Sequence, residues 1–291
     1  MERTVNIGLA QLAYTGDVKS MMSKTAEKVI ELSKLGAQII CLQELYRSDY
    51  FCDKEDYANF SLAESLSGDS VKLFSPIAKE YKVVIILPIF EKRTHGLYHN
   101  SIVVLDADGS VLGVYRKMHI PDDPGFYEKF YFTPGDLGFK VFKTRYGTIG
   151  TLICWDQWFP EGARLAALAG AEILFYPTAI GWAVEEKNLQ IRQEQIDAWE
   201  TIQRAHSIAN GIFVCTVNRV GIEKNFLQFW GHSFVYGPFG RLKKRLSNNH
   251  EEVAIVECEL SEIDYYRTHW PFLRDRRVDA YDNILKRFSE V

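Results

Sequence analysis

Short apolar segments alternate along this chain with segments of helical periodicity, and that alternation restricts the fold more than any other feature. Residues 5–12 alternate like a strand, and Asp17 then precedes a stretch with helical spacing that continues to about Leu35. Gly36 ends this helix, and residues 37–42 form an apolar run typical of a strand that is buried on both faces. The pattern predicts an α/β fold.

The same alternation continues through the rest of the chain. Further elements are expected as strands over residues 83–87, 101–105, 111–115, 148–154, 172–176, 212–217, 233–236 and 253–257, and as helices over 70–81, from Pro160 onward, and over 188–210. A hairpin turn is expected at residues 106–109. In the helix over 188–210, apolar side chains fall near one face, namely Ile191, Ile196, Trp199, Ile202 and Ile208. No flexible linker, charge block or repeat divides the sequence, so we expect residues 1–291 to form a single domain.

The charge and hydropathy of the chain exclude several classes of partner. With a formal net charge of -4 and a pI of about 6.0, no basic surface for nucleic acid or acidic lipid is expected. No run of about eighteen apolar residues occurs, and the first residues lack the basic leader and apolar core of a secretory signal. We therefore expect a cytoplasmic protein that has no membrane span and binds a small molecule.

The cysteine pattern and the absence of several motifs exclude some classes of cofactor site and catalytic site. The five cysteines are odd in number and include no C-x-x-C pair, which argues against both a disulfide framework and a zinc ribbon. The glycine patterns of dinucleotide and P-loop sites, the H-E-x-x-H motif and the G-x-S-x-G motif do not occur. We therefore expect no cofactor and no metal, and a cysteine nucleophile stays possible.

Two ionisable side chains follow predicted strands. Glu44 comes after the buried run in IICLQELY (residues 39–46), at the sheet edge where open α/β folds bind ligands. Lys117 lies in LGVYRKMHIP (residues 112–121), where a strand runs into a loop, and an ammonium group suits a developing oxyanion. Each segment alone also has a simpler explanation: a strand-end glutamate that contacts a helix or water, and a solvated Arg-Lys pair.

Cys154 lies in GTLICWDQWFPE (residues 150–161), where a strand is followed by a polar and aromatic turn and then by a helix. A thiol at such a turn projects above the sheet, with backbone N–H groups close enough to bind an oxyanion. A buried core cysteine is the alternative interpretation of this segment. The sequence therefore offers Cys154 as the candidate nucleophile.

Together, these three segments resemble the nitrilase superfamily of carbon–nitrogen hydrolases, in which a Glu–Lys–Cys triad lies on strand ends in that chain order. The resemblance covers nearly the whole chain and implies that Glu44, Lys117 and Cys154 form the triad. It also implies a four-layer α-β-β-α sandwich and a homodimer or larger homo-oligomer. The expected roles are general base for Glu44, oxyanion stabilisation for Lys117, and covalent attack for Cys154.

A closer resemblance is to the N-carbamoylputrescine amidases. It is carried by RKMHIPDDPGFYEKFYF (residues 116–132), CWDQWFPE (residues 154–161) and YPTAIGW (residues 176–182). This resemblance implies a small N-carbamoyl amine as substrate, cleaved to putrescine, carbon dioxide and ammonia.

Five further residues are expected to support the triad or to bind substrate. By resemblance, Glu128 lies beside the triad and positions substrate or lysine, the alternative being a loop salt bridge with its neighbour in the chain. The backbone N–H of Trp155 is expected at the oxyanion. Asp122 and Asp123 suit a cationic amine tail, although Pro-Asp-Asp-Pro is also ordinary turn chemistry. Trp182 offers a cation–π face or packs in the core.

Other functions stay open at this point. The first is hydrolysis of N-carbamoyl-β-alanine or a related carboxylate-bearing substrate, which would need an arginine or another cation at the tail end of the pocket. An ω-amidase or a true nitrilase would share the triad chemistry. A binding protein without catalytic activity on the same fold is the alternative from another class.

Overall fold

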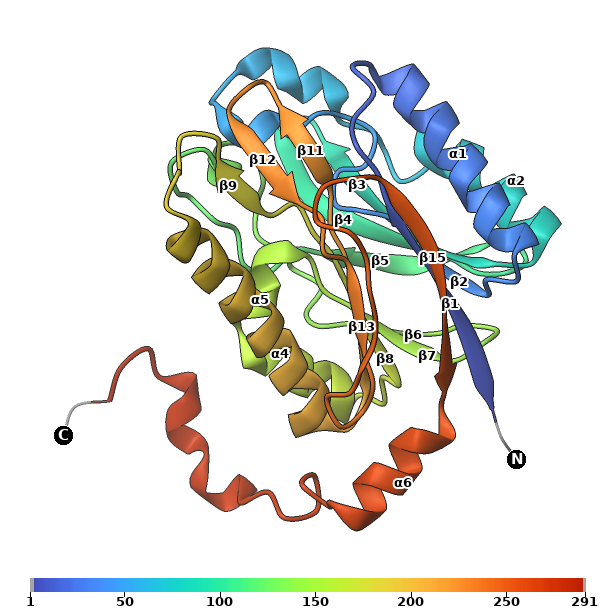
Figure 1. The fold of residues 1–291 in the computed structure, drawn as a ribbon, viewed down its shortest axis with the longest axis vertical. Coiled ribbons are helices and arrows are strands. Elements are labelled where there is room, and N and C mark those ends of the chain that lie inside the picture. The colour runs from blue at the N-terminus through green and yellow to red at the C-terminus, as the bar shows by residue number, and fades with distance from the viewer. Residues whose placement is uncertain (1–2, 290–291) are drawn as a thin grey trace.

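The apolar strands pair into two six-stranded sheets in the computed structural model, which describes residues 3–289 (Figure 1). The first sheet contains β1 (Thr4–Gln11), β2 (Ile39–Cys41), β3 (Val84–Thr94), β4 (Leu97–Leu105), β5 (Val111–Arg116) and β15 (Glu252–Glu259). The second contains β6 (Val141–Lys143), β7 (Thr148–Thr151), β8 (Ile173–Pro177), β10 (Phe213–Val217), β13 (Phe234–Tyr236) and β14 (Leu242–Arg245). Their strand orders are β15-β1-β2-β3-β4-β5 and β14-β13-β10-β8-β7-β6, and both sheets mix parallel and antiparallel pairs.

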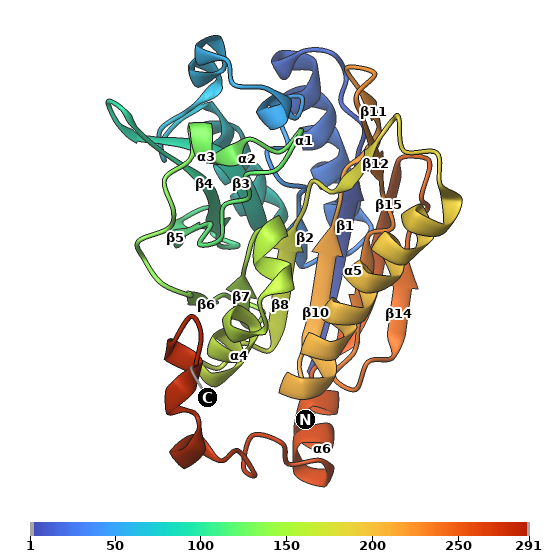
Figure 2. The same cartoon turned by 90° about the vertical axis from the view of Figure 1, so that its left-hand side faces the viewer.

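Helices cover the outer face of each sheet. The six α-helices of the described residues are α1 (Val18–Lys34), α2 (Asp69–Tyr81), α3 (Glu128–Tyr131), α4 (Pro160–Leu168), α5 (Leu189–Asn210) and α6 (Ser261–His269). Helices α1 and α2 pack on the first sheet, and Figure 2 shows α4 and α5 side by side over the second. This arrangement confirms the predicted four-layer α-β-β-α sandwich.

Alternation along β3 explains why this strand contributes side chains to two different apolar clusters. Val84 and Ile86 belong to the apolar cluster that joins the two sheets, whereas Ile85 and Leu87 belong to the cluster beneath α1 and α2. Successive side chains of a strand point to opposite faces, so a strand that is apolar throughout serves both cores. The pairing of β2 with β3 ends at Ile86, before Pro88, whose missing N–H therefore removes no ladder bond to β2.

Most predicted elements are confirmed, and the predicted capping residues lie at the ends of the helices. Asp17 caps α1 by accepting a hydrogen bond from the Ser20 N–H at 2.9 Å. Asn188 caps α5, which ends at Gly211 with a positive φ of 57°. Strands β4 and β5 pair as the predicted hairpin.

Two predictions were wrong in detail. The strand predicted over 148–154 stops at Thr151, because Cys154 has a φ of 40° and starts a 3-10 helix, η3 (Cys154–Trp158). The buried face of α5 includes Ile196 and Trp199, but it continues through polar side chains, whereas Ile191 is exposed. Hydrogen bonds to a buried glutamine of η3, described below, explain why this face of α5 is polar.

Several short elements gave no clear sequence signal. A third sheet has the order β11-β12-β9 and consists of β9 (Gly181–Ala183), β11 (Val220–Glu223) and β12 (Leu227–Trp230). The segment after β2 contains two 3-10 helices, η1 (Phe51–Asp53) and η2 (Tyr57–Leu62). Strands of three or four residues are too short for periodicity to identify. Two of their residues, Gly181 of β9 and Trp230 of β12, nevertheless line the cavity of the candidate site.

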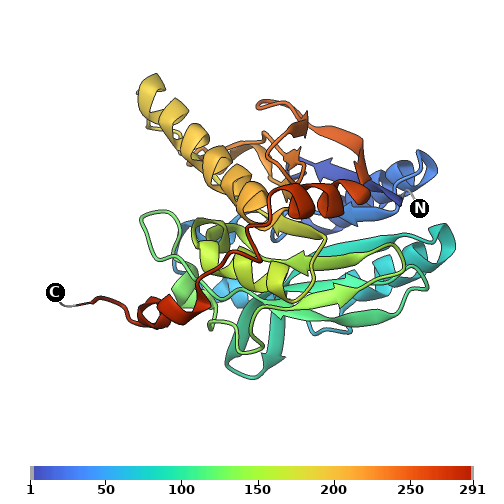
Figure 3. The same cartoon turned by 90° about the horizontal axis from the view of Figure 1, so that it is seen from below.

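The segment that follows α6 forms an arm that leaves the two sheets and lies beside α4 (Figures 1 and 3). It contains two 3-10 helices, η4 (Val278–Ala280) and η5 (Asp282–Leu285). Large apolar side chains of the arm are exposed, with Leu285 91% and Phe288 81% accessible. The rest of the described chain therefore leaves these side chains uncovered.

The cysteines and the hydropathy of the helices bear on two general expectations from the sequence. The five cysteines are all unpaired and buried, as the absence of a disulfide pattern predicted. Within residues 3–289, no helix has both the length and the apolar character needed to cross a membrane.

Candidate active site

Glu44 lies just beyond the carboxyl end of β2, and its side chain is fully buried. Its Oε1 atom accepts two hydrogen bonds, from Asn100 Nδ2 at 2.7 Å and from Lys117 Nζ at 2.8 Å. The other oxygen, Oε2, has no hydrogen-bond partner among the described residues. A buried carboxylate with one free oxygen is suited to accept a proton from a group placed next to it.

Lys117 follows β5 and is also fully buried. Its ammonium group lies between two carboxylates, 2.8 Å from Glu44 Oε1 and 2.7 Å from Glu128 Oε2. Burial alone would lower the pKa of Lys117, but the charges of Glu128 and Glu44 outweigh it and raise this pKa well above its usual value. Lys117 is therefore a fixed positive charge.

Glu128 starts α3 and completes this buried cluster. Its Oε2 accepts from Lys117, and its Oε1 accepts from the Tyr50 hydroxyl at 2.8 Å. The alternative interpretation, a loop salt bridge with Lys129, is therefore wrong, because the Glu128 side chain is buried and pairs with Lys117. Burial raises the pKa of Glu128 to about 7, although Lys117 opposes the shift.

Cys154 lies where β7 gives way to η3, and its backbone is in the left-handed region at φ 40°. That conformation is unusual for a residue with a Cβ and persists only where surrounding contacts impose it. The thiol is buried, and its Sγ lies 3.8 Å from the carbonyl oxygen of Ala179. Burial, followed by the charge of Glu44, raises the pKa of this thiol well above its usual value, so the resting cysteine is neutral.

Asp156 supplies the contacts that hold this strained turn. Its Oδ2 accepts from the Ile153 N–H at 2.9 Å and from the Tyr115 hydroxyl at 2.7 Å. Its Oδ1 accepts from the His119 N–H at 3.0 Å and contacts His119 Nδ1 at 2.7 Å. One buried carboxylate therefore ties the residue before Cys154 to β5 and to the loop that follows Lys117.

Gln157 connects η3 to α5. Its Oε1 accepts from Trp199 Nε1 at 2.8 Å and from Gln203 Nε2 at 3.2 Å, and its carbonyl oxygen contacts His206 Nε2 at 2.8 Å. These bonds satisfy buried polar groups that would otherwise destabilise the fold. They explain why α5 turns a partly polar face inward.

A cavity of about 620 Å³ opens above Cys154. Its apolar wall includes Phe126, Trp155, Trp158, Ile191 and Trp230. Its ionisable lining within residues 3–289 consists of Cys154 and three carboxylates, those of Asp123, Glu128 and Glu194, with no lysine or arginine. The cavity thus combines a thiol at its base with an acidic and aromatic wall.

The structure separates the predicted supporting residues into two groups. Asp123, Glu128 and Trp155 line the cavity. Asp122 is exposed and lies outside the lining. Trp182 is buried against Trp230, with its ring centroid 5.0 Å away, and it also lies outside the lining.

Four other polar residues of this region did not stand out from the sequence. Asp156 and Gln157 lay within the segment that identified Cys154, but nothing in that segment showed which side chains they would bind. Asn100 reaches Glu44 only because β4 pairs between β3 and β5. Glu194 lies on α5 among other charged and polar residues, and nothing in the sequence singled it out.

The sequence and the structure were compared with those of known proteins. The family model for carbon-nitrogen hydrolases matches residues 6–268. A structure described as a carbon-nitrogen hydrolase from Helicobacter pylori G27 is 47% identical, has a TM-score of 0.95, and is matched over 99% of this chain and 100% of that one. The chain belongs to the carbon–nitrogen hydrolase family.

Relatives with named activities indicate which kind of carbon–nitrogen hydrolase this chain resembles. An N-carbamoylputrescine amidase of Oryza sativa subsp. japonica is 44% identical over 97% of this chain and 94% of its own length. A citrullinase of Francisella tularensis is 38% identical over 98% of this chain and 99% of its own length. This member of the nitrilase superfamily is therefore a hydrolase of carbon–nitrogen bonds other than peptide bonds, as the resemblance predicted.

The contacts of Asp156 generate a prediction. Asp156→Asn replaces an acceptor oxygen with an amide donor and removes the charge, so the buried N–H of Ile153 or of His119 loses its partner. We expect the free energy of unfolding to fall by about 2 kcal/mol and the pH dependence of Cys154 alkylation by iodoacetamide to change. Urea unfolding and mass spectrometry measure the two effects.

Asp106→Asn is the matched control, because Asp106 Oδ1 also accepts two backbone N–H groups, at 2.9 and 3.0 Å, but lies in a hairpin away from the site. It should leave the alkylation unchanged. An Asp156→Asn protein with wild-type stability and alkylation would show that Asp156 does not hold the turn.

Proposed function

We propose that this hydrolase cleaves N-carbamoylputrescine to putrescine, carbon dioxide and ammonia. The observation that carries the proposal is the buried Glu44–Lys117–Glu128 cluster, which adjoins a cavity with Cys154 at its base and carboxylates in its wall. The amidase of Oryza sativa supports the same substrate. A ureido group is a poor electrophile, so a nucleophile, a proton carrier and an oxyanion site are all needed.

In the proposed first step, Cys154 Sγ attacks the ureido carbonyl carbon while Glu44 accepts the thiol proton. This coupling suits a thiol whose raised pKa keeps it neutral until substrate is bound. Lys117 and the backbone N–H of Trp155 stabilise the negative oxygen of the tetrahedral intermediate. The carbon–nitrogen bond to the terminal amino group then breaks, and Glu44 returns the proton to the departing ammonia.

The second step releases the product. The first step leaves an N-alkyl thiocarbamate on Cys154, in which the carbonyl carbon is bonded to sulfur and to the putrescine nitrogen. Water attacks this carbon and gives its proton to Glu44, and the carbon–sulfur bond breaks as the thiol is protonated again. The N-alkyl carbamic acid that leaves then loses carbon dioxide and yields the free amine.

The carboxylates in the cavity wall favour a substrate whose tail carries an ammonium group. Asp123 and Glu194 line the cavity together with aromatic side chains, and both kinds of group attract a cation. A carboxylate-bearing tail such as that of N-carbamoyl-β-alanine would meet no cation among the described lining residues. This charge pattern favours the amine over the acid.

Citrulline is a second candidate substrate, because the Francisella tularensis relative is a citrullinase. Citrulline has the same ureido group and an ammonium group, but it also has a carboxylate. The lining carboxylates disfavour that third group. Comparing the two substrates therefore tests the role of the wall directly.

Glu128 is proposed to hold Lys117 in place. Its carboxylate and that of Glu44 lie 2.7 and 2.8 Å from the ammonium group, so that Lys117 has two anionic partners. With two fixed partners the ammonium cannot rotate away from the base of the cavity. Glu128 also lines the cavity and is available to the substrate's nitrogen.

The exposed arm supports a homodimer or larger homo-oligomer. Apolar side chains as exposed as Leu285 and Phe288 are expected at a surface that a partner covers. We further propose a cytoplasmic location, which agrees with five unpaired cysteines, and a single domain, because β1 pairs with β15 from the distant end of the sequence.

The substrate proposal is tested by ammonia release from N-carbamoylputrescine, citrulline and N-carbamoyl-β-alanine, with Cys154→Ala as the blank. We expect the highest kcat/KM for N-carbamoylputrescine and no turnover by the variant. A preference for N-carbamoyl-β-alanine would overturn the substrate assignment. Turnover by Cys154→Ala would overturn the mechanism.

The acidic wall leads to a second prediction. Asp123→Asn and Glu194→Gln should each raise KM for N-carbamoylputrescine about two- to fivefold, as expected for an ion pair near the surface. The value of kcat should change little, because the tail keeps its charge throughout the reaction. Asp122→Asn is the matched control and should behave as wild type. Equal effects at Asp122 and Asp123 would contradict a specific contact.

The arm leads to a third prediction. Light scattering should give a molar mass at least twice the 33.5 kDa of one chain, and Leu285→Asp should shift the protein toward the monomer. Leu35→Asp is the control, because Leu35 is 65% exposed at the end of α1, far from the arm in the fold. A wild-type protein that is monomeric at micromolar concentration would refute the proposed assembly.

A further inference from the structure

Tyr50 connects the buried cluster to a part of the chain that the proposed mechanism does not use. Its hydroxyl donates to Glu128 Oε1 at 2.8 Å, and its backbone N–H donates to Glu223 Oε2 at 2.6 Å. Its ring packs against Phe126 and Phe229, with centroids 5.5 and 5.9 Å away. The residue is buried and lies six positions after Glu44 in the sequence.

The charges of the cluster explain why this hydroxyl matters. Glu44 and Glu128 are two carboxylates that share one cation, Lys117, so their negative charge is only partly compensated. Two neutral donors stabilise the negative charge that Lys117 does not compensate. Asn100 donates to Glu44, and Tyr50 donates to Glu128. Without the hydroxyl, Glu128 Oε1 would lose the one donor that it has among the described residues.

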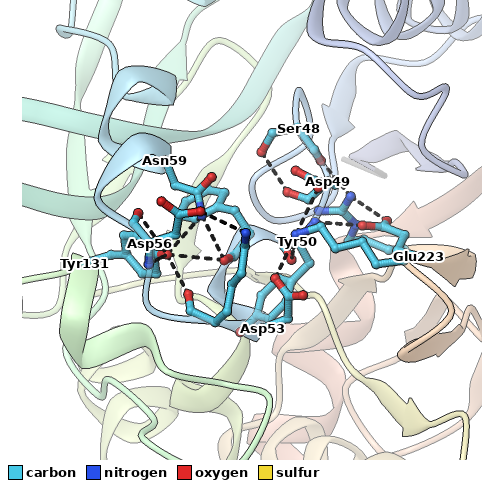
Figure 4. A network of polar contacts seen from close by, with 12 residues as sticks. Ser48, Asp49, Tyr50, Asp53, Asp56, Asn59, Tyr131 and Glu223 are labelled. Carbon is cyan, nitrogen blue, oxygen red and sulfur yellow. Dashed lines mark hydrogen bonds and ion pairs between the residues drawn. The ribbon is translucent and has the colours of Figure 1, made fainter.

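The position of Tyr50 is fixed from the third sheet (Figure 4). Arg219 donates to Glu223 Oε1 at 2.6 Å and to the carbonyl oxygen of Ser48 at 2.7 Å. Lys224 pairs with Asp49 at 3.0 Å and with Asp53 at 2.7 Å. Residues on both sides of Tyr50 are therefore bound to the turn between β11 and β12.

The other end of this segment has a separate attachment. Tyr131 accepts a hydrogen bond from the Asp56 N–H at 2.9 Å and another from Asn59 Nδ2 at 3.0 Å, and its hydroxyl donates to the carbonyl oxygen of Lys54 at 2.6 Å (Figure 4). The Tyr131 hydroxyl thus holds the same segment without a hydrogen bond to the Glu128 carboxylate. The Tyr131 hydroxyl therefore holds only the segment, whereas the Tyr50 hydroxyl binds the Glu128 carboxylate.

From this geometry we propose that Tyr50 is a positioning residue for the hydrolysis: its hydroxyl keeps Glu128 ionised and oriented on Lys117, and Glu223 sets the position of Tyr50. The proposal rests on the proposed function, because it assigns Tyr50 an effect on turnover through the Lys117 ammonium. Tyr50 itself forms no hydrogen bond with Lys117 or with Cys154, so its effect on the reaction is indirect.

The ionisation of the surrounding groups agrees with this role. Burial and the charge of Glu128 raise the pKa of Tyr50 well above its usual value, so Tyr50 stays a neutral donor. Burial raises the pKa of Glu128 to about 7, and the hydrogen bond from Tyr50 acts in the opposite direction. The other titratable groups that act on Glu128 or respond to its charge are Lys117, Glu44, Cys52 and Cys154. Burial raises the pKa of both thiols well above the usual value, so neither ionises near pH 7.

Tyr50→Phe tests the proposal because it keeps the ring and removes only the donor. The pKa of Glu128 should then rise, and an enzyme that needs this carboxylate ionised loses activity on the acid side. In the pH profile of kcat/KM, we expect the acid limb to move to higher pH by about one unit. Activity would then be roughly eightfold lower than wild type at pH 6.5 and nearly unchanged at pH 9. An unshifted acid limb, or an equal loss at every pH, would overturn the proposal.

Tyr131→Phe is the matched control. It removes a buried hydroxyl that holds the same segment, so it should lower the thermal unfolding temperature without moving the acid limb. If both variants moved the limb equally, loosening of the segment would explain the result and the role of Tyr50 would be wrong. Glu223→Gln should move the limb in the same direction as Tyr50→Phe, by a smaller amount.

A second readout needs no knowledge of the substrate. The negative charge of Glu128 raises the pKa of the Cys154 thiol, so partial loss of that charge favours the thiolate. Alkylation of Cys154 by iodoacetamide at pH 7 should therefore be faster in Tyr50→Phe than in wild type, whereas turnover is slower. If wild type hydrolyses none of the three ureido substrates while this alkylation change occurs, the proposed function fails and the effect of Tyr50 on Glu128 stands. If wild type is active and the alkylation does not change, the inference about Tyr50 fails alone.

Discussion

A lysine ammonium buried between two carboxylates is the interaction on which the rest of this structure depends. The charges of Glu44 and Glu128 keep Lys117 charged in this buried position, and Lys117 in turn opposes the effect of burial, which raises the pKa of Glu128. The three residues come from the ends of β2 and β5 and from the start of α3, so these elements must meet at one point. Asn100 and Tyr50 then stabilise the unshared negative charge, which extends the constraint to β4 and to the segment after β2.

Cys154 adjoins this cluster under a second constraint. Its backbone is strained, and Asp156 compensates by binding the residue before it as well as groups on β5 and its following loop. The same carboxylate therefore relates the position of the thiol to the position of Lys117. Burial beside Glu44 keeps the thiol neutral, which agrees with a mechanism in which the thiol loses its proton as it attacks.

In the proposed reaction, the substrate tail lies against elements other than those that carry the buried Glu44–Lys117–Glu128 cluster. The cavity wall is formed by the loop that contains Asp123, by α5 with Glu194, and by the third sheet with Trp230. The related N-carbamoylputrescine amidase and citrullinase are named for substrates that share a ureido head and an ammonium group and differ by a carboxylate. In the proposed reaction, a wall with carboxylates and aromatic rings would distinguish such tails by their charge.

The sequence by itself determined the alternation of strands and helices, most helix ends, and the candidates Glu44, Lys117 and Cys154, because apolar periodicity, caps and motif order are local properties. Only the tertiary structure decided that Glu128 faces Lys117 instead of Lys129, that Asp123 lines the cavity and Asp122 does not, and that α5 buries a partly polar face. It also brought Tyr50, Asn100 and Asp156 to the site. Those outcomes depend on pairing between segments far apart in the chain, where a buried polar group must find a partner that the local sequence does not specify.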